Sequence, residues 1–219
     1  MVGQPVFRIN EGCPAGEIAS HVVGAAGGSL YFIRVPASDT ERVSELARLG
    51  FEVVDCGITL SRAPEPAVED PASVIEAGPE HAGRVAIIGG SAFAMSRFHL
   101  DPHMHPGSAD AIKREWARNC ATGGRGVATL VALHDGEVAG FLAVLAAGED
   151  HVIDLVAVDG RYRGLGIGRS LVQAFIARFG PRSAQLLVGT QAANVASLRM
   201  YEALGFRVQS SHYAMHLHT

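Results

Sequence analysis

The stretch "DGRYRGLGIGRSL" (159–171) places four glycines and three arginines between two apolar runs. The preceding run, "HVIDLVAV" (151–158), is typical of a buried strand, and the run that follows, "RSLVQAFIARFG" (169–180), is typical of a helix. The first N–H groups of a helix have no intrahelical partners, and together with the helix dipole they favour an anion. The stretch is therefore a candidate anion site at a strand–helix junction.

The composition of this loop indicates which anion. Every second residue lacks a side chain, so phosphate oxygens can approach the backbone at Gly164, Gly166 and Gly168. Charge-assisted contacts are available from Arg161, Arg163 and Arg169. A pyrophosphate fits best; the structural alternative is a tight loop that only closes the junction.

Two familiar phosphate-binding patterns do not apply. A Walker loop is excluded because the chain contains no Gly-Lys-Ser/Thr. A dinucleotide fingerprint should follow the first strand of a βαβ unit, whereas this loop lies late in the chain and follows an antiparallel hairpin.

The loop resembles a known family. Residues 163–168 fit the R-x-x-G-x-G signature of the GNAT superfamily of N-acetyltransferases, and Asn194 with "YEALGF" (201–206) is similar to the second cofactor motif of that fold. The resemblance covers roughly residues 74–219. It implies an α/β fold with a mixed central sheet and flanking helices, and acetyl-CoA as co-substrate.

A closer resemblance is to the dTDP-fucosamine N-acetyltransferases, which acetylate a nucleotide-linked 4-amino sugar. It rests on "SAFAMSRF" (91–98) and "VGTQAANVASLRMY" (188–201). Those enzymes also carry a small N-terminal domain. The chain departs from them at "HLDPHMHP" (99–106), where an aromatic-rich stretch is expected.

Composition narrows the class of protein. The 219 residues carry a formal charge of −4 and are 48% apolar, which argues for a globular chain and against a nucleic-acid partner. Residues 1–10 do not read as a signal peptide, and the longest apolar run (138–147) is too short to span a bilayer. Three dispersed cysteines support neither disulfides nor zinc. We expect a cytoplasmic protein without a membrane partner; a homodimer is left open.

The Pro-rich stretch "APEPAVEDPAS" (63–73) predicts a linker between a small N-terminal αβ domain (1–62) and an acetyltransferase domain (74–219). In the first piece, a strand (30–37) precedes a helix with a capping box from Ser38 to Glu41. In the second, strands and helices alternate, and a hairpin turns at Asp135-Gly136.

One segment is echoed within the chain. "LYFIRVPASDTERVSELARLGFEVV" resembles "LLVGTQAANVASLRMYEALGFRVQ" in element order and in its Leu-Gly-Phe-x-Val ending. Common αβ patterns alone could produce this likeness. The sharper hypothesis is a partial copy, in which residues 30–60 form a strand–helix–strand unit equivalent to residues 185–217.

The family resemblance implies a set of cofactor contacts. Acetyl-CoA would lie in a V where strand 151–158 diverges from strand 184–190, with its pantetheine along the backbone and a main-chain N–H near Leu155–Val156 facing the thioester oxygen. The cofactor-binding residues implied are Leu155, Val156, Val158, Arg163, Gly164, Gly166, Ile167, Gly168, Arg169 and Asn194.

Two side chains are candidates for catalysis. The resemblance makes Tyr201, two helical turns after Asn194, the acid that protonates the CoA sulfur; the alternative is core packing. Asn194 could cap its helix, bind the pantetheine arm, or do both. Asp154 interrupts an apolar strand and is a candidate base. Its alternatives are a carboxylate held by a backbone or arginine partner, and a water chain that serves as the base.

The acceptor would meet residues 97–99. Arg97 suits the phosphates of a nucleotide sugar, with Phe98 and His99 beside it, and Trp116 could stack a base or sugar or simply be buried. Alternate histidines and an aspartate superficially suggest a metal: His99, Asp101, His103 and His105. Because this spacing makes a poor tetrahedral cage, no metal site is predicted.

We therefore expect an acetyl-CoA-dependent N-acetyltransferase that acts on an amino sugar of the dTDP-4-amino-4,6-dideoxyhexose type by direct transfer. The rivals are another small amine (an aminoglycoside, a polyamine or an amino acid) and a non-catalytic acyl-CoA-binding regulatory module. Tyr201 favours an enzyme over the last of these, because a binding module needs no acid there.

Overall fold

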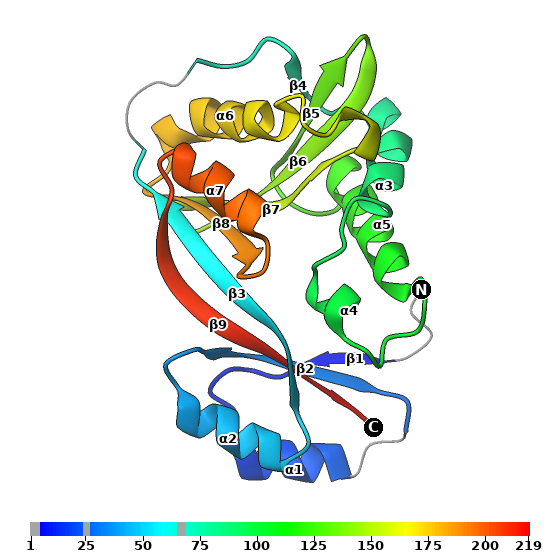
Figure 1. The fold of residues 1–219 in the computed structure, drawn as a ribbon, viewed down its shortest axis with the longest axis vertical. Helices are drawn as coiled ribbons and strands as arrows, with labels where there is room; N and C mark the ends of the chain where they lie inside the picture. The colour runs from blue at the N-terminus through cyan, green and yellow to red at the C-terminus, as the bar shows by residue number, and fades with distance from the viewer. Residues whose placement is uncertain (1–4, 24–26, 65–68) are drawn as a thin grey trace.

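A computed structural model describes residues 5–23, 27–64 and 69–219. In it a single mixed sheet runs in the order β1-β2-β9-β3-β8-β7-β6-β5-β4, with helices packed against it (Figure 1). The strands are β1 (Val6–Arg8), β2 (Leu30–Pro36), β3 (Glu52–Arg62), β4 (Val74–Glu76), β5 (Ala128–His134), β6 (Glu137–Ala147), β7 (Asp150–Val158), β8 (Leu186–Gln191) and β9 (Arg207–His218). The helices are α1 (Ala15–Val23), α2 (Thr40–Arg48), α3 (Ala82–Gly89), α4 (Arg97–Leu100), α5 (Ser108–Ala121), α6 (Ile167–Phe179) and α7 (Val195–Ala203).

This architecture confirms the predicted α/β class with a mixed sheet and flanking helices. The hairpin is also confirmed: Asp135 and Gly136 both have positive φ, 50° and 78°, as a two-residue turn between β5 and β6 requires. Among the described helices, none has the length and apolar character needed to cross a bilayer.

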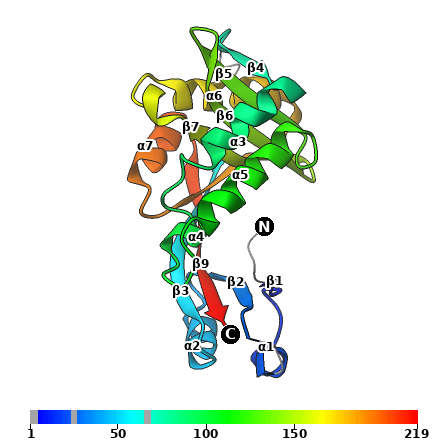
Figure 2. The same cartoon turned by 90° about the vertical axis from the view of Figure 1, so that its right-hand side faces the viewer.

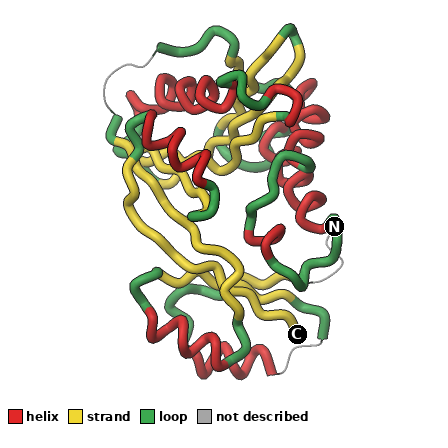
Figure 3. The backbone as a smooth tube through the Cα atoms, viewed as in Figure 1, coloured by secondary structure: helices red, strands yellow, loops and turns green. Residues whose placement is uncertain are grey.

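Helices cover both faces of the C-terminal part of the sheet. Residues of α6 and α7 pack into one apolar cluster with β8 and the start of β7. Residues of α3 and α5 form a second cluster on the opposite face of β6 and β7, the face turned toward the viewer in Figure 2. A third cluster joins α1 and α2 to β2 and β9 at the other end of the molecule (Figure 3).

The sheet is continuous across the predicted domain boundary. Strand β9 pairs with both β2 and β3, and β3 pairs in turn with β8. In Figure 1, β3 and β9 run together from the C-terminal part to the N-terminal unit. The division into 1–62, 63–73 and 74–219 remains a prediction about the chain, and residues 65–68 of that linker lie outside the described residues.

The predicted echo is confirmed as an order of elements. The unit β2-α2-β3 repeats β8-α7-β9, and its helices begin at Thr40 and Val195, 155 positions apart. The second strands begin at Glu52 and Arg207, again 155 positions apart. The repeat extends further, because β1 lies parallel to β2 as β7 lies parallel to β8, with α1 and α6 as the connecting helices.

Local chemistry matches across the repeat. The cap of α2 is Asp39, whose carboxylate accepts from the Arg42 N–H; the predicted cap, Ser38, lies one residue too early. Asn194 caps α7 in the same way, 155 positions later. Both helices end before a glycine with positive φ and a buried phenylalanine, which are Gly50 and Phe51 in one copy and Gly205 and Phe206 in the other.

The strand register follows the same symmetry. Pro36 of β2 pairs with His212 of β9, and their counterparts, Gln191 of β8 and Gly57 of β3, pair with each other. Within the β3–β9 ladder, Gly57 pairs with His212, and these two residues occupy equivalent positions in the two repeated units. A local two-fold axis therefore passes through this pair. The register shifts, one on each side of that pair, are also related by the axis.

A side chain at position 57 would break this arrangement. An added Cβ would collide with the imidazole of His212, whereas Gly189 on the neighbouring strand has open space at that point. We expect Gly57→Ala to lower the free energy of unfolding by about 1–2 kcal/mol, as overpacking does. The same change in a His212→Ala background should cost much less, and Gly189→Ala is the matched control. Urea melts of the double-mutant cycle measure this; equal costs in both backgrounds would contradict a steric origin.

Candidate active site

Strands β7 and β8 separate to form a V. Their parallel pairing ends at Ile153–Val188, and the later residues of β7 have no strand partner on that side within the described ladder. Opposite, on β6, the register jumps from Ala143–Leu155 to Val144–Ile153, so Asp154 is the extra residue of a β-bulge. The V predicted from the family resemblance is therefore present.

The bulge changes which face each residue of β7 meets. Leu155 packs with the α3 and α5 cluster, whereas Val156 and Val158 pack with the α6 and α7 cluster. Asp154 also turns toward α5, because it contacts Trp116 there. Beyond Ile153, the edge of β7 that faces β8 leaves backbone N–H and C=O groups for another extended group, as the pantetheine prediction needs.

The glycine loop leads into α6 at the mouth of this V. Gly164 and Gly166 have φ values of 80° and 79°, which favour glycine, and Gly166 caps α6 without any side-chain bond. The first N–H groups of this thirteen-residue helix thus meet no capping side chain. A Cβ on Gly168 would lie 3.5 Å from Sδ of Met200 and 3.7 Å from Cγ2 of Val158, between α7 and β7.

The loop arginines play different parts. Arg161 pairs with Asp159, which caps the short turn at 160–162 and also bonds Arg84. Hydrogen bonds from the Arg161 side chain and backbone hold the pKa of the Asp159 carboxyl well below its usual range. Arg163 donates to the Ala92 carbonyl at 3.0 Å and so ties the loop to the segment before α4.

Arg169, in the first turn of α6, is exposed, as are Arg161 and Arg163.

Asn194 and Tyr201 both belong to α7. The Asn194 amide oxygen accepts from the Ser197 N–H at 3.3 Å, and its nitrogen donates to Oγ1 of Thr190 at 3.2 Å. Tyr201 is 1% exposed and packs edge-to-face on Phe206, in the same apolar cluster as Val156 and Val158. Burial raises the pKa of Tyr201 above its ordinary value, so the phenol keeps its proton at neutral pH. Core packing and proton donation are thus compatible.

Asp154 has protein partners on both carboxylate oxygens. Arg125 donates to them from Nε at 2.7 Å and Nη2 at 3.0 Å, and Nε1 of Trp116 donates at 2.8 Å. This is the arginine-held carboxylate that the sequence left as the alternative to a base. Because these donors occupy both carboxylate oxygens, the geometry favours a role in positioning Trp116 and Arg125.

The segment after α3 brings Arg97 into a partly buried position. Its guanidinium lies 4.0 Å from the Phe32 ring centre and 4.5 Å from that of Phe98. Burial, together with the smaller effect of the neighbouring Arg34, lowers the pKa of Arg97 to about 10. Its Nε is buried and has no hydrogen-bond partner among the described residues.

The other two predicted acceptor residues have protein contacts. Phe98 is buried against Leu30 and Ala109. His99 contacts Ser96 through Nδ1 at 2.6 Å and Asp110 through Nε2 at 3.1 Å. The structure thus places Arg97 as the residue of the three with a charged group left to bind a ligand.

Sequence reasoning missed Lys113. It is 8% exposed, on the face of α5 that also buries Ala109 and Ala117, four residues to either side. Its Nζ lies 4.8 Å from the Phe93 ring centre and 4.5 Å from that of Trp116. Burial lowers the pKa of Lys113 to about 8. The sequence did carry a signal for this residue, because Lys113 lies four residues from Ala109 and from Ala117 and so falls on the apolar face of the helix.

Comparisons with known proteins match these features. Residues 92–206 fit the model of the acetyltransferase (GNAT) family. The chain belongs to the GNAT family. The family is one of acetyltransferases.

Individual relatives differ in what their names say. The chain is 31% identical over 193 residues to the spore coat polysaccharide biosynthesis protein SpsD of Bacillus subtilis, covering 85% of this chain and 65% of that one. It is 41% identical over 91 residues to N-acetylaspartate synthetase of Rattus norvegicus, covering 39% and 30%. A GCN5-related N-acetyltransferase from Kribbella flavida has the same fold, with a TM-score of 0.61 at 16% identity, over 98% of this chain and 79% of that one. The chain thus spans about two thirds or less of the curated relatives it matches.

A side chain at position 168 should exclude acetyl-CoA. Gly168 lies in the first turn of α6, and the protein leaves ordinary space for a Cβ, so Gly168→Val should fold. Its branched side chain would occupy the mouth of the V. We expect calorimetric binding of acetyl-CoA to be abolished, whereas Gly160→Ala, in an open part of the same loop, should bind normally. Tight binding by a folded Gly168→Val variant would refute the assignment of this corner.

Replacing Tyr201 with Phe removes the proton donor but keeps the ring against Phe206. General acid catalysis typically contributes roughly 10²–10⁴-fold, so kcat should fall within that range while the KM for acetyl-CoA changes little. Steady-state and pre-steady-state kinetics on one preparation measure both. Near-normal kcat, with chemistry shown to be rate-limiting, would leave Tyr201 with packing alone.

Proposed function

We propose that the chain transfers the acetyl group of acetyl-CoA directly to the amine of a nucleotide-linked amino sugar of the dTDP-4-amino-4,6-dideoxyhexose type. The observation that carries this is a pair of desolvated cations, Arg97 and Lys113. Neither has an ion-pair partner among the described residues, and both contact aromatic rings instead. Burying a charge without a counter-ion is unfavourable, so an anionic ligand would relieve both.

These cations are connected to the reacting end of the V. Lys113 contacts the Trp116 ring, and Trp116 donates to Asp154 at the bulge of β7. Arg97 lies close enough to Lys113 to lower the pKa of that lysine. An acceptor whose phosphates bind Arg97 and Lys113 would therefore reach toward the bulge from the α5 side of the sheet. Acetyl-CoA would enter from the side of α6 and α7.

The chemistry of the transfer assigns a part to each group. The neutral amine nitrogen forms a bond to the thioester carbon, the C–S bond breaks, and the nitrogen gives up a proton to water, from which the Tyr201 phenolate is afterwards reprotonated. A main-chain N–H near Leu155–Val156 would stabilise the developing oxyanion. The CoA sulfur leaves as a thiolate and takes the proton of Tyr201, whose pKa is kept high by burial.

The names of the relatives point to two classes of acceptor, a sugar and an acidic amino acid. SpsD is named for polysaccharide biosynthesis, which favours a sugar. The N-acetylaspartate synthetases are named for an acidic amino acid, which makes such an amine the second candidate.

Polyamines and aminoglycosides are cations that Arg97 and Lys113 would repel. A non-catalytic module would have no need of a proton donor at position 201. The predicted cytoplasmic location suits acetyl-CoA and a nucleotide sugar as substrates, and a homodimer stays a prediction.

An acceptor panel tests the proposal. Acetyl-CoA consumption should be fastest with dTDP-linked 4-amino sugars, slower with aspartate and absent with spermidine. Arg97→Gln should raise the acceptor KM roughly 10–100-fold, because a charged hydrogen bond contributes about 1.5–3 kcal/mol, and should leave the KM for acetyl-CoA unchanged. Arg118→Gln, which removes an exposed arginine of α5, is the matched control. Turnover of spermidine but not of the nucleotide sugars would overturn the acceptor class.

A further inference from the structure

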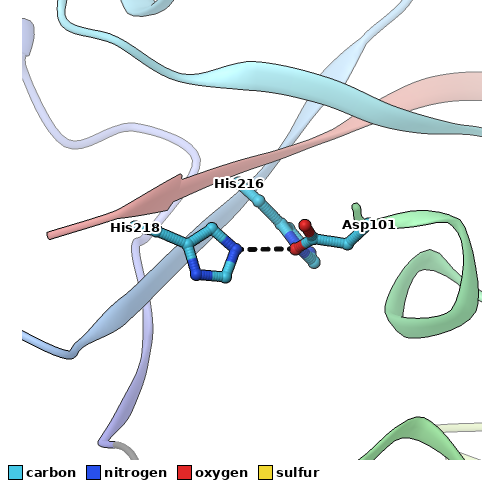
Figure 4. A group of neighbouring side chains, drawn as sticks. All are labelled: Asp101, His216 and His218. Atoms are coloured by element: carbon cyan, nitrogen blue, oxygen red, sulfur yellow. Dashed lines mark hydrogen bonds and ion pairs between the residues drawn. The ribbon is translucent and has the colours of Figure 1, made fainter. Parts of the chain in front are cut away.

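A second cluster of reactive side chains lies at the far end of β9, away from the V. His216 and His218 alternate on this strand and so share one face of it, and Asp101 meets them from the loop after α4 (Figure 4). Oδ2 of Asp101 lies 2.6 Å from Nδ1 of His216 and 2.8 Å from Nε2 of His218. Sequence analysis placed Asp101 among loop histidines, yet its partners come from more than a hundred residues away.

The protein holds these groups in a defined orientation. The other oxygen of Asp101 accepts from the His103 N–H at 2.9 Å, which leaves Oδ2 facing both imidazoles. Asp101 and His216 are buried, at 4% and 2% exposure, and His218 is partly exposed. The second ring nitrogen of His216, Nε2, is buried and has no hydrogen-bond partner among the described residues. Among the described residues, Asp101 is therefore the only hydrogen-bond partner of the His216 imidazole.

The donor set is that of a transition-metal site. One ligand atom from each residue lies within 4.8 Å of the other two. Zinc binds imidazole nitrogen and carboxylate oxygen at about 2.0–2.2 Å in a tetrahedron, which separates donors by roughly 3.3–3.5 Å. The two separations from Oδ2 of Asp101 are shorter than this by less than about 1 Å, and the two imidazole nitrogens lie within 4.8 Å of each other. Small side-chain rotations would therefore open the triad around an ion.

A cavity and a further candidate metal ligand, His103, lie beside Asp101, His216 and His218. A cavity of about 280 Å³ is bordered by the three residues together with His103 and Glu52. Nε2 of His103 lies 3.4 Å from Glu52, and its ring centre lies 5.4 Å from that of His218. Either His103 or a water molecule in this cavity can complete a four-coordinate site.

We propose that Asp101, His216 and His218 bind one Zn²⁺ ion, which fastens the loop after α4 to the C-terminal strand. The ion would cross-link two segments that are remote in sequence and are otherwise joined here by hydrogen bonds and packing. His216 also lies 6.2 Å, between ring centres, from Phe98, which stacks on Arg97. The ion would thus steady the support of Arg97 without contacting the reacting groups. This proposal stands independently of the acceptor's identity.

Titration of the full, EDTA-stripped chain with ZnCl₂ tests the site. Calorimetry should show one equivalent bound, and Co²⁺ in its place should give the visible absorption of a four-coordinate centre. His218→Gln should weaken Zn²⁺ binding more than about 100-fold, since loss of an outer-shell partner alone typically costs 10–100-fold. His105→Gln removes an exposed histidine of the same loop and should bind normally.

Stability provides a second measurement on the same proteins. Zn²⁺ should raise the Tm of the wild type and of His105→Gln, but not that of His218→Gln, because only a site present in the folded state shifts the melting curve. The partly exposed His218 is chosen so that the variant folds, which circular dichroism checks. Absence of stoichiometric binding by the wild type would show a hydrogen-bonded triad with no metal affinity. Binding by His218→Gln as tight as that of His105→Gln would show adventitious binding. Either result overturns the proposal.

Discussion

The antiparallel ladder between β3 and β9 is the interaction on which the two halves of the molecule depend. β3 is hydrogen-bonded to β8 of the acetyltransferase part, and β9 is hydrogen-bonded to β2 of the N-terminal unit, so each half completes its sheet with a strand from the other. The ladder is organised around Gly57 and His212, where the local two-fold axis would otherwise bring two side chains together. Glycine at one position makes room for an imidazole at the other.

The two repeated units differ at the positions proposed for binding and catalysis. Leu46 stands where the second unit has Tyr201, and each is buried in the same cluster as the phenylalanine that precedes the second strand of its unit. The connection from β1 to α1 contains a single glycine, in contrast to the loop before α6. The N-terminal copy therefore keeps the packing of its counterpart without the phenol or the alternating glycines. Its contribution is to support the sheet and to bring β2 beside the loop that carries Arg97.

In the acetyltransferase part, one backbone irregularity determines the geometry of the candidate site. The bulge at Asp154 lets Leu155 face α5 while Val156 and Val158 face α6, and the β7–β8 ladder ends at the same level. Arg125 and Trp116 hold the bulged residue from the α5 side. On that side, Arg97 is partly buried and Lys113 is buried, and neither forms an ion pair with another described residue, so the binding of an anion would be favourable there. Burial of these two cations lowers the stability of the free protein, which is consistent with a role for them in binding a ligand.

Local features could be predicted from the sequence because they depend on neighbouring residues. The glycine loop, the hairpin at Asp135-Gly136, the α7 motif and the repeated unit all follow from residues a few positions apart, whose backbone preferences are short-range. The α2 cap was misplaced by one residue, since Ser38 and Asp39 are both good caps and only the backbone selects between them.

Tertiary structure decided the rest, because those contacts join segments distant in the chain. Spacing alone did not pair Asp154 with Arg125, place Lys113 between aromatic rings, or bring His216 and His218 to Asp101. Each contact requires the strand order of the sheet and the packing of α5 against it. The sequence by itself thus determined the family, the glycine loop and the repeated order of elements. The long-range pairing of β3, β8 and β9 brought distant residues together. Only this pairing determined which charges are neutralised, which stay available to a ligand, and where the two halves share a strand.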